Sequence, residues 1–207
     1  MTHIGHSEKV FNMKRLLLIL ILTFSFQALT KADDIKDFEI EGISIGDSLL
    51  NFMTKDEILD NIELNKDVHF YLTDKFSQVY KYNGLSKYHL VSFYIKKRDK
   101  DFKIYGITGS MDHVENITEC HKQMDEIAQE FSKIFKDTER KEANYNHGID
   151  KSGRSKVKEI YFLLKTKSKA RIVCMDFEEN LRKKNNWIDG LDISLQTNDV
   201  TEWFNNR

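Results

Sequence analysis

Hydrophobic and polar residues alternate along the middle of the chain, in three runs that cover residues 76–82, 88–96 and 102–111. Alternation with a period of two is typical of strands that bury one face. Asn83-Gly84 is a turn signal between the first two runs, and the charged stretch 97–101 separates the second run from the third. The pattern therefore predicts a meander of three antiparallel strands.

The spacing of apolar residues changes to threes and fours between residues 114 and 135, with Glu, Lys and Gln in the intervening positions. This spacing places the apolar side chains on one side of a helix. We therefore expect an amphipathic helix of about six turns, whose apolar side needs a sheet or another helix to cover it. The residues on that side are Val114, Ile117, Met124, Ile127, Phe131 and Ile134.

Strand-like alternation returns in the second half of the chain, at residues 157–165, 170–177 and 187–195. The first two of these runs predict a hairpin, because a short connection of Lys, Ser and Thr joins them. The chain then closes with a short helix over residues 199–206, and we expect its two large aromatic residues to dock it on the domain.

An apolar run near the start of the chain has the features of a secretory signal peptide. Lys14 and Arg15 precede the eleven-residue run Leu16–Phe26, and a small-x-small site ends at Ala32. A helix that spans a bilayer needs about 20 apolar residues, so the run is too short for a membrane anchor. We expect cleavage after Ala32; the alternative is an N-terminal helix buried in the core.

The polar residues 1–12 are longer than the usual segment before such a cationic head, so we expect Met13 to be the true start of the protein. Removal of residues 1–32 leaves 175 residues (207 − 32), with 28 basic and 32 acidic side chains and a net charge of −4 (28 − 32). This balance gives no reason to expect binding to nucleic acid or attraction to anionic lipid. We expect no membrane span after removal of the signal peptide.

The composition indicates the kind of organism. The chain has no proline, and lysine outnumbers arginine by 25 to 7. Codons for proline and arginine are scarce in AT-rich genomes, so we interpret both features as a coding bias of a bacterium. Together with the signal peptide, they favour a periplasmic or secreted bacterial protein.

Sequence signals near residue 50 complete the predicted fold. Asp47 can cap a helical turn, and Thr54 and Glu57 have the spacing of a capping box that opens a further turn or two through Asp60. The patterns together predict an α+β fold: a single antiparallel sheet of five or six strands, one long amphipathic helix packed across a face, and short helices at the mature N-terminus and the C-terminus. Because no repeat or flexible linker interrupts residues 33–207, we expect a single domain there.

Two cysteines in an exported chain predict a disulfide. Cys120 lies on the apolar side of the long predicted helix, and Cys174 is in a predicted strand, on the same side as Ile172. A bridge from helix to sheet is therefore reasonable, and the alternative is two buried free thiols. A reactive redox pair is not expected, because the C-x-x-C spacing is absent.

No motif indicates a metal, a cofactor or a catalytic site. His121 and Asp125 are four residues apart, as two metal ligands on a helix can be, but the alternative is a hydrogen-bonded helix face. The chain has no H-E-x-x-H, EF-hand, Walker, dinucleotide-binding or G-x-S-x-G motif. We therefore expect no cofactor and no metal, and we predict no catalytic residue.

The connection 136–155 is the segment in which we expect a function. Loops longer than about 12–15 residues without structure of their own are uncommon, and are usually functional or disordered. Lys151 and Arg154 suit a carboxylate or phosphate group of a partner; the alternative is a solvated connection. The candidate residues are His147, Asp150, Lys151, Ser152 and Arg154, around Gly148 and Gly153.

Three stretches together resemble an uncharacterised family of small exported bacterial proteins: ADDIKDFEIEGISIGDSLL (32–50), NITECHKQ (116–123) and DKSGRS (150–155). The resemblance runs from the signal peptide to the end of the chain. It implies export and a single domain with paired cysteines, and brings no assigned activity, cofactor or catalytic residue. The stretch 42–58 also resembles small envelope-assembly lipoproteins of two helices and a hairpin sheet, although the cysteine that carries the lipid is absent here.

These observations predict a non-catalytic periplasmic binding or interaction protein, whose partner is an unidentified protein or small molecule. One alternative is a small hydrolase-like enzyme with a site assembled from scattered residues. Another is an accessory protein of envelope assembly.

Overall fold

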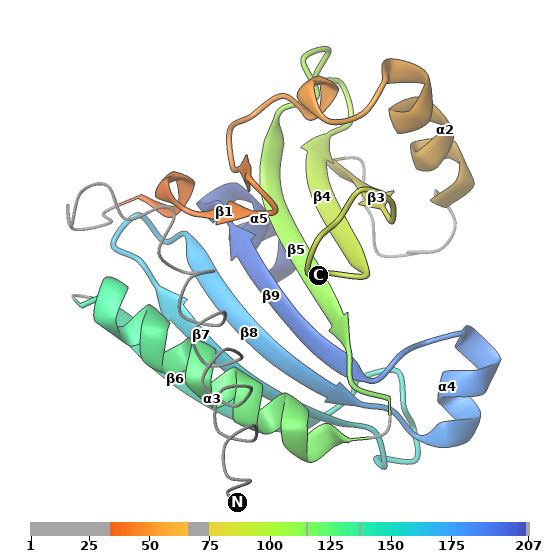
Figure 1. Cartoon of the computed structure of the whole chain (residues 1–207), viewed down its shortest axis with the longest axis vertical. Helices are drawn as coiled ribbons and strands as arrows, with labels where there is room; N and C mark the ends of the chain where they lie inside the picture. The colour runs from red at the N-terminus through yellow and green to blue at the C-terminus, as the bar shows by residue number, and fades with distance from the viewer. Residues whose placement is uncertain (1–33, 66–74, 115, 137, 206–207) are drawn as a thin grey trace, which may run out of the picture. The chain divides into compact units, whose positions relative to one another are not determined.

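The computed structural model describes residues 34–65, 75–114, 116–136 and 138–205 (Figure 1). All of them belong to the second of the two units into which the chain divides, Ala32–Arg207. The predicted signal peptide therefore lies outside the described residues.

A seven-stranded antiparallel sheet is the frame of this unit (Figure 1). The strand order is β3-β4-β5-β9-β8-β7-β6, so that β9, the last strand of the chain, lies at the centre. β9 pairs with β5 on one side and with β8 on the other, and so joins two meanders. The strands are β3 (Phe76–Lys81), β4 (Leu90–Lys96), β5 (Ile104–Asp112), β6 (Glu139–Asn146), β7 (Lys156–Leu163), β8 (Lys169–Asp176) and β9 (Gly190–Gln196).

Helices and a small ribbon surround this sheet. None of the described helices is long and apolar enough to cross a membrane. The ribbon turns at Glu41-Gly42, whose φ angles of 55° and 74° are those of a two-residue type I′ turn. The elements are α2 (Lys55–Asn65), α3 (Ile117–Ile134), α4 (Glu179–Asn185), α5 (Asn198–Asn205), the 3₁₀ turns η2 (Ile35–Asp37) and η3 (Leu49–Asn51), and the ribbon strands β1 (Glu39–Ile40) and β2 (Ile43–Ser44).

The predicted fold, a single sheet of five or six strands with one long helix, is wrong. The structure has a seven-stranded sheet, a separate two-stranded ribbon and, within the described residues, four α-helices. β6 was not predicted, because its sequence, ERKEANYN, is polar on both faces of the strand. Almost every residue of β6 is exposed. The ribbon was not predicted either, because its strands have only two residues each. Two residues are too few to show an alternation of apolar and polar positions.

α3 lies across one face of the sheet, which we call the core face (Figure 1), and contacts β7, β8 and β9. The side chain of Asn116 caps the helix by accepting a hydrogen bond from the backbone N–H of Glu119 at 3.1 Å. The buried side of α3 consists of Cys120, Met124 and Ala128. Alternate residues of the strands form the other half of this core: Ile160, Phe162, Ile172, Leu191, Ile193 and Leu195.

The N-terminal segment packs on the remaining part of the core face, over β4 and β5. Its apolar residues continue the same buried cluster as α3, so one core runs along the whole of this face. The contributing residues are Ile35, Ile40, Ile43, Ile45 and Leu49, together with Val91, Phe93 and Ile107 of the sheet.

α5 packs on the opposite side of the sheet, which we call the second face. Val200 and Trp203 of α5 are buried against Phe76 and Tyr94 in a separate apolar cluster. The ring of Trp203 lies 5.2 Å from that of Phe76 and 6.0 Å from that of Tyr94. The C-terminal helix is thus held on the sheet by aromatic contacts.

Cys120 of α3 and Cys174 of β8 form a disulfide, with Cα atoms 6.1 Å apart. The predicted disulfide is confirmed, and the alternative of two free thiols is wrong. Both cysteines are buried in the core between the helix and the sheet. In the chain-entropy description, closing a loop of 54 residues stabilises the fold by up to about 4 kcal/mol.

Candidate functional site

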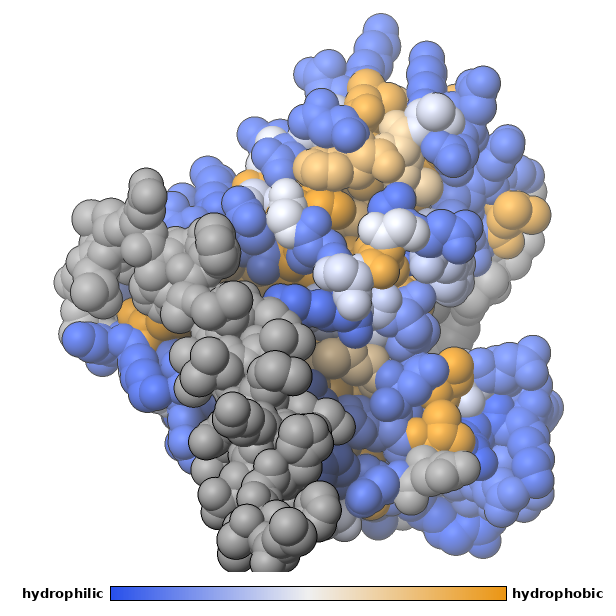
Figure 2. All heavy atoms as spheres, in the orientation of Figure 1, coloured by the Kyte–Doolittle hydropathy of each residue, from blue (hydrophilic) through white to orange (hydrophobic). Residues whose placement is uncertain are grey.

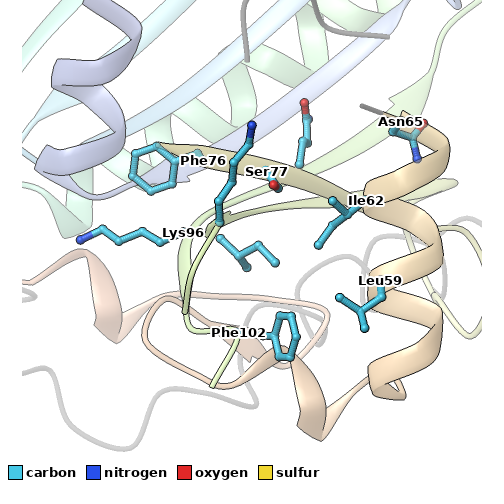
Figure 3. Close-up of a pocket in the computed structure, with 10 residues that line it drawn as sticks. Leu59, Ile62, Asn65, Phe76, Ser77, Lys96 and Phe102 are labelled. Atoms are coloured by element: carbon cyan, nitrogen blue, oxygen red, sulfur yellow. The ribbon is translucent and has the colours of Figure 1, made fainter. Parts of the chain in front are cut away.

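A cavity of about 240 Å³ lies between α2 and the β3 edge of the sheet (Figure 3). Leu59 and Ile62 point from α2 toward Phe102 and the strands. Five of the lining residues are apolar, and the other five are two amides, one hydroxyl and two lysines, whose stems are apolar. The lining residues are Leu59, Ile62, Asn65, Phe76, Ser77, Gln78, Ile95, Lys96, Lys97 and Phe102.

Local sequence fixes where α2 begins. The backbone N–H of Thr54 donates to Glu57 Oε2 at 2.7 Å, and the N–H of Glu57 donates to Thr54 Oγ1 at 3.3 Å. This is the reciprocal pair of a capping box, as the sequence indicates. The helix continues to Asn65, beyond the one or two turns that we expected through Asp60, and the additional turn carries the wall residue Ile62.

Asn61 attaches α2 to the outer edge of β3. Its side chain donates to the carbonyl oxygen of Tyr80 and accepts from the N–H of the same residue, both at 2.9 Å. The amide therefore takes the place of a neighbouring strand at this point of the edge. Because α2 is held at Tyr80, its apolar residues stand over the part of β3 that begins at Phe76.

The wall residue Phe102 has a strained backbone, with a φ angle of 47°. A non-glycine residue in this backbone region destabilises the fold by about 1–3 kcal/mol, and it persists only where the surrounding contacts hold it there. The N–H of Leu49 donates to the carbonyl oxygen of Phe102 at 3.0 Å, and the Phe102 side chain is buried. Strain of this kind is concentrated at functional sites, and here it directs an aromatic ring into the wall of the cavity.

The side chain of Gln78 lies on the second face of the sheet, beside Tyr94 and Ser92. Its Nε2 donates to Ser92 Oγ at 3.1 Å, whereas its Oε1 is buried without a partner. A buried acceptor without a hydrogen bond costs about 1–3 kcal/mol. Because this oxygen is buried on the second face, it is not part of the cavity wall.

The positive charge of Lys96 at the cavity is already compensated. Its Nζ lies 2.8 Å from Asp199 Oδ2 and 4.2 Å from the centre of the Tyr105 ring. The hydrogen bond to Asp199 raises the pKa of Lys96 against the lowering effect of burial. The lysine therefore stays charged and paired, and is no general base.

The chemistry of the lining residues favours binding over catalysis. The set contains no His, Cys, Asp or Glu side chain, so it offers neither a nucleophile with a base nor a pair of carboxyl groups. Apolar residues also reach the surface beside the cavity: Leu50 and Leu59 are 43% and 45% exposed, and Figure 2 shows apolar side chains gathered over this part of the unit.

The segment 136–155, in which we expected a partner loop, is mostly a β-hairpin. Its first half contains β6, and residues 147–155 form the turn to β7. Asp150 organises the turn: its carboxylate accepts from the N–H and the hydroxyl of Ser152, at 2.8 and 2.6 Å, and from the N–H of Ser155 at 2.6 Å. The Ser152 hydroxyl is the first of the donors that hold the pKa of Asp150 far below its ordinary value.

The other predicted residues of this turn have different surroundings. Arg154 pairs with Glu178, the N-cap residue of α4, at 3.0 Å. His147 packs between the rings of Phe177 and Trp187, at 5.2 and 5.3 Å, and burial lowers its pKa. Lys151 is exposed on the turn. The turn lies beside α4 and away from α2 (Figure 1), so the predicted residues and the cavity are separate places.

The second face of the sheet carries a group of four polar side chains that the sequence analysis did not predict. We call this group the polar belt: Tyr145, Glu159, Arg171 and Asp192. The Arg171 Nε donates to Glu159 Oε1 at 2.7 Å, and the Tyr145 hydroxyl donates to Glu159 Oε2 at 3.1 Å. Arg171 also attracts Asp192 on its other side. These residues occupy strand positions whose side chains point away from the core. That they lie side by side can be recognised only when the strand pairing is known.

The two carboxyl groups of the belt have pKa values shifted in opposite directions. Burial on its own would raise the pKa of Glu159, but Arg171 holds it below the ordinary value of 4.5. Burial raises the pKa of Asp192 above its ordinary value of 3.8, against a hydrogen bond from Ser110 and the charge of Arg171. Carboxyl groups in such contrasting surroundings are also found at catalytic sites.

Asp125, one of the two residues that we considered as metal ligands, is paired with a lysine of the sheet. Its Oδ1 lies 3.5 Å from Lys158 Nζ. Within the described part of the chain, no three His, Cys, Asp or Glu side chains form a group that suits a metal ion.

Comparison of the chain with protein-family models, with curated proteins and with solved structures finds no match.

Proposed function

We propose that this protein is an exported, non-catalytic binding protein, and that the cavity between α2 and β3 binds a small apolar group. The observation that carries this proposal is the set of apolar residues from separate segments of the chain that line the cavity: Leu59, Ile62, Phe76, Ile95 and Phe102. Apolar walls supply affinity through burial.

The size of the cavity supports a ligand group the size of a substituted benzene ring. An engineered apolar cavity of about 150 Å³ binds benzene, and the cavity here has about 240 Å³. The aromatic rings of Phe76 and Phe102 in its wall suit a flat apolar group.

Ethylbenzene provides the test, because it is apolar and carries one flat ring. We expect it to shift the amide signals of the cavity residues in a titration followed by NMR. Ile62→Trp fills the cavity and should abolish this binding.

The matched control is Leu64→Trp, which adds the same ring at an exposed position of α2 and should leave binding of ethylbenzene unchanged. Binding that survives Ile62→Trp contradicts the cavity as the site.

Export is supported by the disulfide, because structural disulfides persist in oxidising compartments and are rare in the cytosol. We expect the full chain, expressed in a bacterium, to be recovered from the periplasmic fraction with Asp33 as its first residue. Intact mass measurement of the fractionated protein tests this directly. A cytoplasmic product that retains residues 13–32 contradicts export.

The polar belt favours a second candidate function, a small hydrolase-like enzyme on the second face of the sheet. Its support is the pair Glu159 and Asp192, whose pKa values are shifted in opposite directions on either side of Arg171. The test is turnover of p-nitrophenyl esters and glycosides by the purified protein. Hydrolysis that Asp192→Asn abolishes supports this function; no hydrolysis, or hydrolysis that persists in the variant, contradicts it.

A further inference from the structure

β6 forms one edge of the sheet, and within the described residues no strand pairs with its outer side. The N–H of His147 donates to the carbonyl oxygen of Ser155 across the β6–β7 pair. Backbone groups of odd-numbered residues in β6 therefore face β7, and those of even-numbered residues face outward. The outward residues are Arg140, Glu142, Asn144 and Asn146.

This edge lacks three of the usual features that prevent pairing with another chain, and its charges, the fourth feature, balance one another. Edge strands are commonly short, bulged, interrupted by proline or charged, especially with lysine. β6 has eight residues in an unbroken register with β7 and contains no proline. Its four charges come as Glu139, Arg140, Lys141 and Glu142 and sum to zero, so a second strand of the same sequence is not repelled.

We propose that β6 pairs antiparallel with β6 of a second copy of this chain, around a two-fold axis at Ala143. This register is the one in which all four outward-facing residues of each strand find a partner, with Arg140 opposite Asn146 and Glu142 opposite Asn144. On the other face, Ala143 lies against its own copy and Lys141 lies opposite Tyr145. The chain already contains this last type of contact, since Lys169 lies 4.7 Å from the centre of the Tyr161 ring.

Neighbouring registers are less favourable for identifiable reasons. An axis at Lys141 or at Glu142 places two like charges directly opposite each other, which destabilises a strand pair. An axis at Asn144 moves Arg140 beyond the end of the partner strand, so fewer outward groups are paired. Charge and hydrogen bonding thus select the axis at Ala143, and the sheets of the two copies become continuous.

Light scattering coupled to size-exclusion chromatography tests the dimer over a concentration series. We expect the purified protein to be dimeric at high concentration, and Asn144→Pro to shift the dissociation constant upward by at least about tenfold, because proline removes an outward N–H and leaves the bonds to β7 intact. The matched control Asn144→Thr retains the N–H and should remain dimeric. A monomer at all concentrations overturns the proposal, as does equal dimerisation of the proline and threonine variants.

Cysteine crosslinking tests the register. Under oxidising conditions Ala143→Cys should form an intermolecular disulfide, because directly opposite residues approach within disulfide range. Lys141→Cys should not, because four residues of strand, roughly 13 Å, separate its two copies along the axis. Crosslinking of Lys141→Cys but not of Ala143→Cys overturns the register. The pairing edge is β6 and the ligand cavity is at β3, so the two proposals fail independently.

Discussion

Gly190 begins β9 at a point where the backbone of β5 leaves no room for a side chain. A Cβ atom on this residue would lie 2.3 Å from the carbonyl oxygen of Met111, so the strands must separate to accept it. We expect Gly190→Ala to lower the free energy of unfolding by about 2–3 kcal/mol in urea denaturation. Gly148→Ala is the control, since its Cβ meets nothing within 4 Å, and it should change stability by less than about 0.5 kcal/mol. Similar losses in both variants would contradict this explanation.

Glu41, at the turn of the β1–β2 ribbon, binds a loop more than forty positions later in the chain. Its carboxylate accepts from the N–H and hydroxyl of Ser86, at 3.1 and 2.7 Å, from the N–H of Lys87 at 2.7 Å and from the N–H of Tyr88 at 3.3 Å. Burial on its own would raise the pKa of Glu41, but these hydrogen bonds hold it below the ordinary value of 4.5. Three successive backbone donors make the loop a concave receptor for the carboxylate.

The lowered pKa of Glu41 determines how its contribution depends on pH. A carboxyl group with a depressed pKa in the folded state stabilises the protein above its unfolded pKa, and the stabilisation is lost as the pH falls through the folded value. We expect Glu41→Gln to lower the free energy of unfolding by about 1 kcal/mol at pH 7. The difference from the unmodified protein should shrink as the pH falls below 4.5, in urea denaturation at a series of pH values. A difference that is constant with pH would show that charge is not the cause.

Individual residues show what sequence patterns can predict and what they cannot. The pairing of Cys120 with Cys174 was predictable because both stand on apolar positions of elements with a clear period. The cavity was not predictable, because its lining residues, such as Leu59, Ile95 and Phe102, come from three separate segments of the chain. An apolar residue shows no sign of lining a cavity until those segments are placed around it.

At the scale of elements, α3 and β6 show when a periodic pattern is informative. α3 buries one side and exposes the other, so its period was visible, whereas β6 is exposed on both faces and has no period to find. The short helix α4 buries no residue and was missed for the same reason. A periodic pattern arises when an element buries one side and exposes the other. An element that is exposed on all sides has no such pattern and cannot be predicted from it.

The hairpin turn between β6 and β7 allows its structural residues to be separated from its exposed ones. Asp150→Ala removes the acceptor of three hydrogen bonds in the turn and should lower the melting temperature. Because the pKa of Asp150 is depressed, this difference should begin to shrink as the pH falls below 3.8 and disappear only below the much lower pKa of the folded protein. The double variant Lys151→Ala with Arg154→Ala changes only exposed side chains and should melt within about 1 °C of the unmodified protein. A melting temperature that falls equally in both variants would show that the surface cations also hold the turn.

The disulfide joins α3 to β8, and its removal tests how strongly the helix depends on it. The double variant Cys120→Ala with Cys174→Ala should lower the free energy of unfolding by up to about 4 kcal/mol, chiefly because the unfolded chain is no longer constrained. Urea denaturation measures this loss, and addition of a reducing agent to the unmodified protein should reproduce most of it. A reduced protein as stable as the oxidised one would contradict the assignment.

For the whole molecule, the local patterns predicted most strands but not their arrangement. The three-stranded meander and the β7–β8 hairpin follow from connections that are short in sequence. The insertion of β9 between β5 and β8 is a long-range choice that no local pattern specifies. For the same reason, the segment 136–155, in which we expected a function, and the cavity are at different places. A cavity forms only where elements that are distant in sequence meet, and local patterns do not show this.

The central place of β9 governs the order in which the fold can be completed. The β3-β4-β5 and β6-β7-β8 meanders each have an edge that β9 joins, and β9 follows all six of these strands in the chain. A chain emerging from the ribosome therefore holds two unfinished half-sheets until β9 is available. Contacts this distant in sequence also form slowly. The export that we propose requires the chain to cross a membrane before it folds, and a delay of this kind keeps the two half-sheets apart until β9 arrives.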